Sequence, residues 1–165
     1  MEARAAIRQA VLEALVFELG GEQYGVDILK VQEIRGYDKV TPIPRAPDYL
    51  KGVINLRGSV VPVVDLRVKF GLAEPRYDAF TVMVVMRIGA RIIAAVVDAV
   101  SDVVQLSASD IKAAPSFGSL IDSSFIAGVA TGGERMVLLL DIEKLLSTGE
   151  LNLLAEAATS PQVPA

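Results

Sequence analysis

The amino-acid sequence predicts an all-β protein with a few short helices, built as two small barrels of about five strands each and related by internal duplication. Short apolar segments separated by glycine-containing turns follow one another without long intervening helices, which argues against a doubly wound sheet. Hydrophobic residues make up 52% of the chain, but aromatic residues only 5%. The core must therefore consist of Val, Ile, Leu and Ala, and the β-branched residues among them favour strands. An internal repeat is the third observation.

The repeat is clearest between residues 52–71 and residues 128–146. Gly52 lies 13 positions before Asp65, and Gly128 lies 13 positions before Asp141, so the two copies are 76 residues apart. A weaker upstream repeat, at an offset of 69, relates these segments: Leu19-Gly20 to Ile88-Gly89, and Val31-x-Glu33-Ile34 to Val100-x-Asp102-Val103. Two repeats in the same order favour a duplicated subdomain over chance similarity between β-rich segments.

The elements are predicted in the following order. Apolar residues at helical spacing in residues 1–14 predict a short amphipathic helix. Four hairpins follow, with turns at these dipeptides: Gly20-Gly21, Gly58-Ser59, Gly89-Ala90 and Gly132-Gly133. Two hairpins fall in a first barrel over residues 15–79, and two in a second over residues 80–148. A further apolar stripe predicts a C-terminal helix over residues 149–158, and residues 159–165 are expected to be disordered.

Asp65 and Asp141 occupy matching places in the repeat. Each follows an apolar strand and precedes a predicted turn of helix, and Gly71 and Gly149 are placed to end these turns. An aspartate at this position accepts hydrogen bonds from the free N–H groups of the first helical turn. N-capping is therefore the expected role of both carboxylates.

Several residue types that enzymes need are missing. The chain has no histidine and no cysteine, which excludes Ser-His-Asp and Cys-His arrangements, thiolate metal sites and a phosphohistidine intermediate. No glycine-rich phosphate-binding motif occurs. Asp98 and Asp102 are the closest suggestive pair of carboxylates, and a solvated strand end explains them equally well. A carboxylate-only or lysine-dependent enzyme stays an alternative, but the sequence favours a binding module without a cofactor.

The charge distribution limits the class of partner. The net charge is −4 and the basic residues are scattered, which argues against nucleic acid or an anionic membrane as the main partner. The N-terminus lacks an apolar signal-peptide core, and no uncharged apolar run approaches the roughly 18 residues of a membrane span. We therefore expect a cytoplasmic protein that does not insert into a membrane.

Three segments resemble the CheW family of bacterial chemotaxis coupling proteins. They are the run F-E-L-G-G-E-Q-Y-G-V-D-I-L-K-V-Q-E-I-R-G over residues 17–36, the run from Pro47 to Gly71, and R-M-V-L-L-L-D-I-E-K-L-L over residues 135–146. The resemblance covers about residues 15–158. It implies two SH3-like five-stranded barrels and a non-catalytic adaptor that joins the cytoplasmic tips of transmembrane chemoreceptors to the histidine kinase CheA.

The resemblance also implies site residues. The receptor-binding candidates are Val31, Glu33, Ile34, Gly52, Arg57 and, more weakly, Leu153; the kinase-binding candidates are Gly36 and Thr81. The residues themselves support part of this assignment. Arg57 precedes the predicted turn at Gly58, where its guanidinium would meet a carboxylate or carbonyl of a partner helix. Val31 and Ile34 are three apart, so a short helical turn would present both on one face. The alternatives are a solvated arginine and core packing.

Other functions compete with this one. The same scaffold could serve a different chemosensory pathway, such as one that governs surface motility, and the sequence does not separate the two. The kinase itself, or an adaptor fused to a receiver domain, is opposed by the length of 165 residues and the missing histidine. A nucleic-acid-binding SH3-like barrel is opposed by the acidic balance.

Overall fold

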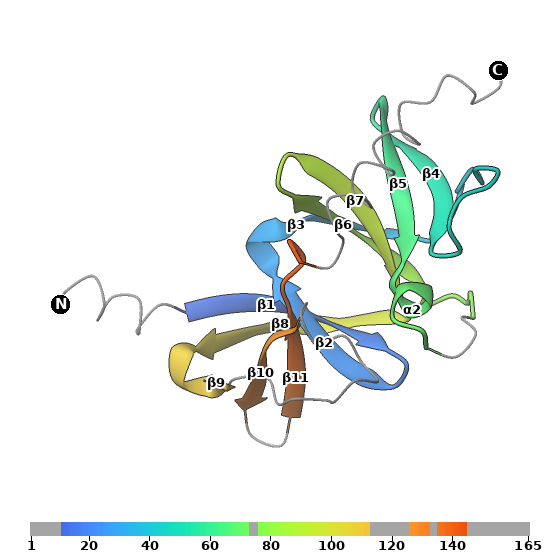
Figure 1. Cartoon of the computed structure of the whole chain (residues 1–165). Coiled ribbons are helices and arrows are strands. Elements are labelled where there is room, and N and C mark those ends of the chain that lie inside the picture. Colours follow the sequence, from blue (N-terminus) through green and yellow to red (C-terminus); the bar gives the residue numbers. More distant parts are fainter. Residues whose placement is uncertain (1–10, 73–75, 113–125, 133–134, 145–165) are drawn as a thin grey trace.

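The computed structural model describes residues 11–72, 76–112, 126–132 and 135–144, and in these ranges the fold is all-β, as predicted (Figure 1). The strands are β1 (Val11–Leu19), β2 (Glu22–Asp27), β3 (Val31–Gly36), β4 (Leu50–Leu56), β5 (Ser59–Asp65), β6 (Val82–Ile88), β7 (Arg91–Val97), β8 (Ala99–Ser107), β9 (Ile111–Lys112), β10 (Ile126–Gly132) and β11 (Arg135–Leu140). The short helices are α2 (Leu66–Lys69) and the 3-10 turns η1 (Ile28–Lys30) and η2 (Ala108–Asp110). No helix within these ranges is long and apolar enough to cross a membrane.

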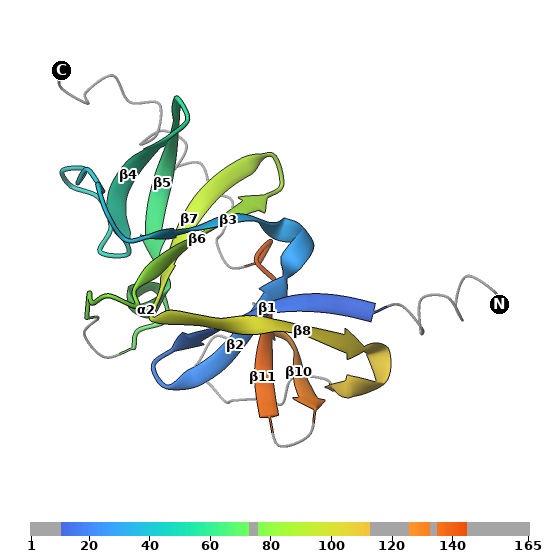
Figure 2. The same cartoon turned by 180° about the vertical axis from the view of Figure 1, so that it is seen from behind.

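Each of the two sheets contains strands from both sequence repeats. The first sheet has the strand order β8-β1-β2-β11-β10-β9, and the second has the order β3-β6-β7-β5-β4. In each sheet a hairpin of one repeat lies between strands of the other, since β1–β2 is flanked by β8 and β11, and β6–β7 by β3 and β5. The exchanged strands β3 and β8 both lie toward the viewer in Figure 2. Neither repeat can therefore complete a sheet by itself.

The pairing registers confirm the duplication. Val31 pairs with Met86 in the second sheet, and Val100 pairs with Phe17 in the first, so that both partners are shifted by 69 positions. A β-bulge follows at the next residue of β3 and of β8. The parallel pairings also match. β5 pairs in parallel with β7, and their counterparts in the repeat, β11 and β2, also pair in parallel. The two halves are thus related residue by residue, although their strands are exchanged.

One central core holds the two sheets together, and equivalent residues of both repeats fill it. They are Leu15 and Val84, Phe17 and Met86, Leu19 and Ile88, Val26 and Ala95, Val64 and Leu140, and Leu66 and Ile142. None of these side chains is more than 6% exposed. Removal of such apolar surface from water is the dominant favourable term in folding. Because both repeats contribute equally, the sheets should fold as one cooperative unit.

Two predictions about the course of the chain need correction. Residues 11–14 lie in β1 and not in a helix, because β1 pairs with β2 on one side and with β8 on the other. The predicted boundary near residue 79 separates the repeats but not the sheets, since β8 to β11 join β1 and β2. The first sheet has six strands, the sixth being the two-residue strand β9. Residues 1–10 and the predicted C-terminal helix and tail, 149–165, lie outside the described residues.

Gly52 and Gly128 occupy equivalent places, each beside a bulge in its hairpin. A Cβ atom on Gly52 would overlap the carbonyl group of Thr41, and Gly52 also has a φ of 148°. A Cβ atom on Gly128 would lie 2.9 Å from the carbonyl oxygen of Lys112. Both glycines are therefore needed where a neighbouring segment passes directly over the hairpin.

Replacement of Gly52 by alanine should destabilise the protein. Both the steric overlap and the positive φ act against the variant, so we expect Gly52→Ala to lower the free energy of unfolding by about 2–4 kcal/mol. Gly58 has a φ of 92° but open space around its Cα atom, so Gly58→Ala should cost only about 1 kcal/mol. Urea denaturation of both variants measures the difference. Equal losses would show that close approach to Thr41 is unimportant.

Candidate protein-protein interface

An ion pair joins two of the predicted receptor-binding residues. The Nη2 atom of Arg57 lies 2.6 Å from Oε1 of Glu33. Glu33 lies on β3 and Arg57 at the β4–β5 turn, so the pair connects opposite edges of the second sheet and closes it toward a barrel. The Arg57 side chain is still 71% exposed. Its guanidinium can therefore bind a carboxylate or carbonyl group of another protein.

A β-bulge places Val31 and Ile34 on one face of β3. The prediction of a helical turn for these residues is wrong, since both lie in the strand. The bulge shifts the alternation so that Val31 pairs with Met86 and Ile34 with Val84. Directly opposed residues share a face of the sheet, and here it is the face that carries the central core. Val31 packs against this core, whereas Ile34 is 43% exposed and available for contact.

The first sheet carries an equivalent surface that sequence reasoning missed. Asp102, the counterpart of Glu33, accepts two hydrogen bonds of 2.9 Å from the guanidinium of Arg135. The exposed large hydrophobic residues include two pairs related by the repeat: Ile34 with Val103, and Val60 with Met136. The offset of 69 identifies Asp102, but Arg135 does not align with Arg57, so no residue pattern indicates this ion pair.

A buried network of charges lies at the opposite end of β5 from Arg57. Asp65 and Arg67 are 0% and 2% exposed, and the guanidinium of Arg67 donates to both carboxylate oxygens of Asp65, at 3.0 and 2.9 Å. Its Nη1 atom also donates to Asp98 at 3.0 Å and to the carbonyl oxygen of Arg76 at 2.6 Å. The hydroxyl group of Tyr77 donates to Asp65 at 2.8 Å. Asp65 caps α2 as predicted, by accepting the amide N–H of Arg67.

These contacts determine the protonation state of the network. Burial alone would raise the pKa of Asp65, but the hydrogen bonds from Arg67 and Tyr77 outweigh burial and hold this pKa below its ordinary value. Burial and the hydrogen bond to Asp65 raise the pKa of the Tyr77 hydroxyl, which therefore donates at neutral pH. A charge pair buried this deeply is tolerated because its polar atoms have partners.

The two kinase-binding candidates lie next to this network. Gly36 ends β3 and is exposed, and the following residue, Tyr37, packs its ring at a tilt against Tyr77, with 4.6 Å between ring centroids. Thr81 is only 3% exposed. Its hydroxyl group accepts the amide N–H of Asp78 at 2.9 Å. Thr81 therefore shapes the loop and offers no side-chain surface to a partner. Leu153, the remaining candidate, lies outside the described residues.

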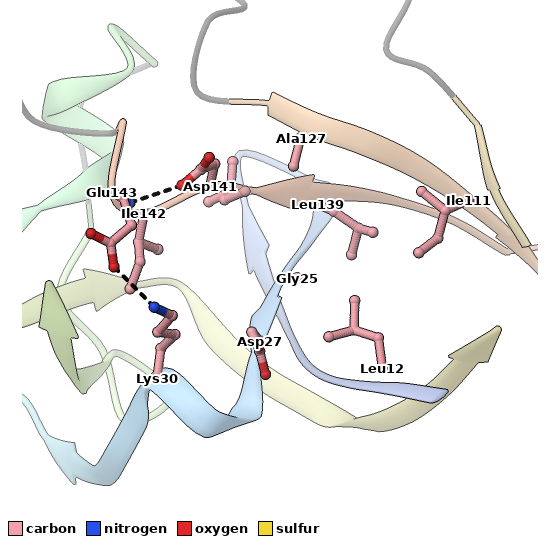
Figure 3. A pocket seen from close by; sticks show the side chains of 11 residues that line it. Leu12, Gly25, Asp27, Lys30, Ile111, Ala127, Leu139, Asp141, Ile142 and Glu143 are labelled. Atoms are coloured by element: carbon pink, nitrogen blue, oxygen red, sulfur yellow. Dashed lines mark hydrogen bonds and ion pairs between the residues drawn. The ribbon is translucent and has the colours of Figure 1, made fainter. Parts of the chain in front are cut away.

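The equivalent end of β11 has a different chemistry (Figure 3). Asp141, the counterpart of Asp65, accepts the amide N–H of Glu143 at 3.1 Å. Glu143 occupies the position of Arg67 and forms an exposed ion pair of 2.9 Å with Lys30. Beside this pair lies a cavity of about 320 Å³ whose walls include Leu12 and Ile142. The same position of the repeat is thus a buried cation in one half and an exposed anion in the other.

Comparison with known proteins identifies the family. Residues 13–150 match the family model described as CheW-like domain. The chain belongs to the CheW family. The protein named chemotaxis protein CheW from Klebsiella aerogenes is 52% identical over 148 residues, covering 90% of this chain and 89% of that protein.

Two more distant relatives in sequence and one solved structure also match most of the chain. Chemotaxis protein CheW from Rhizobium meliloti is 36% identical, covering 84% of this chain and 89% of its own length. Protein FrzA from Myxococcus xanthus is 30% identical, covering 93% of this chain and 96% of its own length. The crystal structure of the scaffolding protein TtCheW from Thermoanaerobacter tengcongensis is similar with a TM-score of 0.78 and 29% identity, and the match covers 86% of this chain and 96% of that one.

Among the described residues, no group of three or more acidic side chains is placed to hold a metal ion.

Removal of Arg67 should destabilise the protein far more than removal of Arg135. Arg67→Ala leaves the buried carboxylate of Asp65 without its main partner, so the free energy of unfolding should fall by about 3–5 kcal/mol. Arg135→Ala breaks an ion pair that is exposed to solvent and should cost at most about 1 kcal/mol. Chemical denaturation of the two variants tests this. A comparable loss in both would mean that burial does not determine the contribution of the pair.

The lowered pKa of Asp65 predicts a specific acid sensitivity. A carboxyl group whose pKa is lower in the folded than in the unfolded state stabilises the fold above its unfolded pKa of about 3.9, and this contribution is lost as the pH falls through the folded value. The free energy of unfolding should therefore decrease as the pH falls below about 5, and it should go on decreasing until the pH is below the folded pKa of Asp65. The decrease should be smaller in Arg67→Ala, in which Asp65 no longer has its cation. Denaturation curves at several pH values measure both slopes, and identical slopes would contradict the assignment.

Proposed function

We propose that this protein is a non-catalytic adaptor that couples the cytoplasmic tips of chemoreceptors to the histidine kinase CheA, brings the kinase under receptor control and helps to assemble the signalling array. The observation that carries the proposal is exposed Arg57, paired with Glu33 on the same edge strand that exposes Ile34, in a chain that resembles relatives named chemotaxis protein CheW in sequence and the scaffolding protein TtCheW in fold. An adaptor needs two separate partner surfaces. β5 separates the Arg57 turn from the buried network by seven residues, or roughly 20 Å.

The receptor would bind at the Arg57 end. An amphipathic receptor helix would place its apolar side against Ile34 and the edge of the core at Val31, and a carboxylate or carbonyl group against Arg57. Gly52 would act indirectly, because it allows the segment at Thr41 to pack against β4. Leu153 is proposed as a further receptor contact on the family resemblance alone.

The kinase regulatory domain would bind near Gly36 and the loop that carries Tyr77, next to the buried network. Gly36 is exposed and a Cβ atom there would meet nothing within 4 Å. Thr81 would contribute by holding its loop. The chain would work in the cytoplasm and reach the membrane-bound array through its partners, without a cofactor and without contact with nucleic acid.

A second candidate function is the same adaptor role in a different signalling pathway. The 30% identity to protein FrzA, which extends over nearly the full length of both chains, supports the same scaffold role in a non-flagellar chemosensory system, such as surface motility or related two-component signalling.

Arg57→Ala should weaken binding to the receptor tip selectively. Loss of one charge-assisted contact should weaken binding by about 1–3 kcal/mol, or roughly 5- to 150-fold. Stability should change by less than about 0.5 kcal/mol, as for ordinary surface substitutions. Arg135→Ala removes the arginine that pairs with Asp102, the counterpart of Glu33 in the other sheet, and is the matched control, with receptor binding unchanged.

Titration of each variant against a receptor tip and against the kinase regulatory domain, with thermal melts, provides the measurement. Arg57 would be structural if both partners bound more weakly by the same factor, or if the melting temperature fell sharply.

A further inference from the structure

The loop from Arg76 to Thr81 is held in one shape by contacts at both ends. The carbonyl oxygen of Arg76 accepts a hydrogen bond from the buried guanidinium of Arg67 at 2.6 Å. At the other end, Thr81 donates its amide N–H to the carbonyl oxygen of Asp78 and accepts the amide N–H of Tyr37 at 3.3 Å. Asp78 also accepts the amide N–H of Phe80 at 2.8 Å. Such a loop loses little conformational entropy when it binds a partner.

This rigid loop exposes aromatic side chains. Phe80 is 71% exposed and Tyr77 is 44% exposed. Two neighbours hold the Tyr77 ring, because the guanidinium carbon of Arg67 lies 4.9 Å from its centroid and the tilted ring of Tyr37 packs against it. A large aromatic side chain presented by a preorganised backbone, with a polar surround, is typical of the anchor residues of protein-protein interfaces.

We propose that Phe80 is the anchor of the kinase-side interface, inserting into an apolar pocket of the kinase regulatory domain, and that Arg67 is the buried positioning residue that holds the loop for it. This inference rests on the proposed function, which requires a second partner away from the receptor. In Figure 1 the β4–β5 turn, which contains Arg57, lies at one end of β5, and α2, which contains Arg67, lies at the other. The loop also adjoins exposed Gly36 through the ring contact between Tyr37 and Tyr77.

Arg67 acts from the interior of the protein. It is too deeply buried to touch a partner, at 2% exposed, and its Nη1 atom connects the loop to Asp98, whose other carboxylate oxygen accepts the amide N–H of Gly20. The loop is thereby fixed to the β1–β2 hairpin and to the start of β8. The position of Phe80 is therefore set by the frame that both sheets share.

The first experiment is a paired titration of wild type, Phe80→Ala and Leu29→Ala against the kinase regulatory domain and a receptor tip. Leu29 is the matched control, because it is an exposed large apolar side chain, 87% exposed, on η1. Phe80→Ala should weaken kinase-domain binding at least about tenfold, with unchanged receptor binding and melting temperature, and Leu29→Ala should change neither affinity. A change of less than about twofold for Phe80→Ala, or an equal effect of Leu29→Ala, would overturn the anchor.

The second experiment tests positioning with a double-mutant cycle. Arg67→Lys keeps the charge, but its ammonium group cannot donate hydrogen bonds to Asp65, Asp98 and the carbonyl oxygen of Arg76 at the same time. Kinase-domain binding should therefore weaken, while receptor binding should stay unchanged. Added to Phe80→Ala, it should cause almost no further loss, because Arg67 acts through the loop that presents Phe80. Fully additive losses would show that Arg67 acts elsewhere.

If Arg67→Lys does not fold, Tyr77→Phe replaces it, since it removes only the hydrogen bond to Asp65 and keeps the ring. The same experiment separates this proposal from the proposed function. Wild-type protein that binds neither partner would refute the adaptor role and the anchor with it. Wild-type binding to both partners, unaffected by Phe80→Ala, would refute the anchor alone.

Discussion

Equivalent apolar side chains of the two repeats, such as Phe17 and Met86, pack into one core, and the whole architecture depends on this shared packing. Each of the two sheets contains strands from both repeats, so a sheet is complete only when both repeats are folded. The arrangement fixes the orientation of the two sheets, because any rotation between them would open the core. Side chains at opposite ends of β5 are consequently held at a constant separation. A protein that must place two partners relative to each other benefits from such a frame.

The duplication also shows where the two halves have diverged. The core positions and bulges match throughout, whereas the residue two positions after the capping aspartate is Arg67 in one half and Glu143 in the other. Arg67 is buried and connects three segments, while Glu143 forms an exposed pair with Lys30. The ion pairs of β3 and β8 differ as well: Arg57 makes a single hydrogen bond to Glu33, and Arg135 makes two to Asp102. The surfaces thus became chemically distinct on a common frame.

Much of this fold could be predicted from sequence, because repeat offsets report which residues are equivalent. The offsets of 69 and 76 are enough to identify the bulged segment at Glu33 and the paired glycines as equivalent positions. They could not show strand exchange, since an offset does not say which strand a segment pairs with. Arg67 was missed because an arginine beside a capping aspartate looks solvent-exposed until the partner at Asp98, 31 residues away, is known. Val31 and Ile34 lie on one face, as the sequence predicts, but the cause is a β-bulge and not a helical turn, and no residue pattern predicts this bulge.

An adaptor of this design holds two independent partner surfaces on one rigid frame, at opposite ends of β5. Calorimetric titration of the kinase regulatory domain into the protein, alone and then saturated with a receptor tip, measures that independence. We expect a ternary complex in which the dissociation constant for the kinase domain changes by less than about threefold, or less than about 0.7 kcal/mol. Competition, with receptor tip displacing the kinase domain in proportion to its concentration, would contradict the two-surface arrangement, because the two proteins would then share one surface.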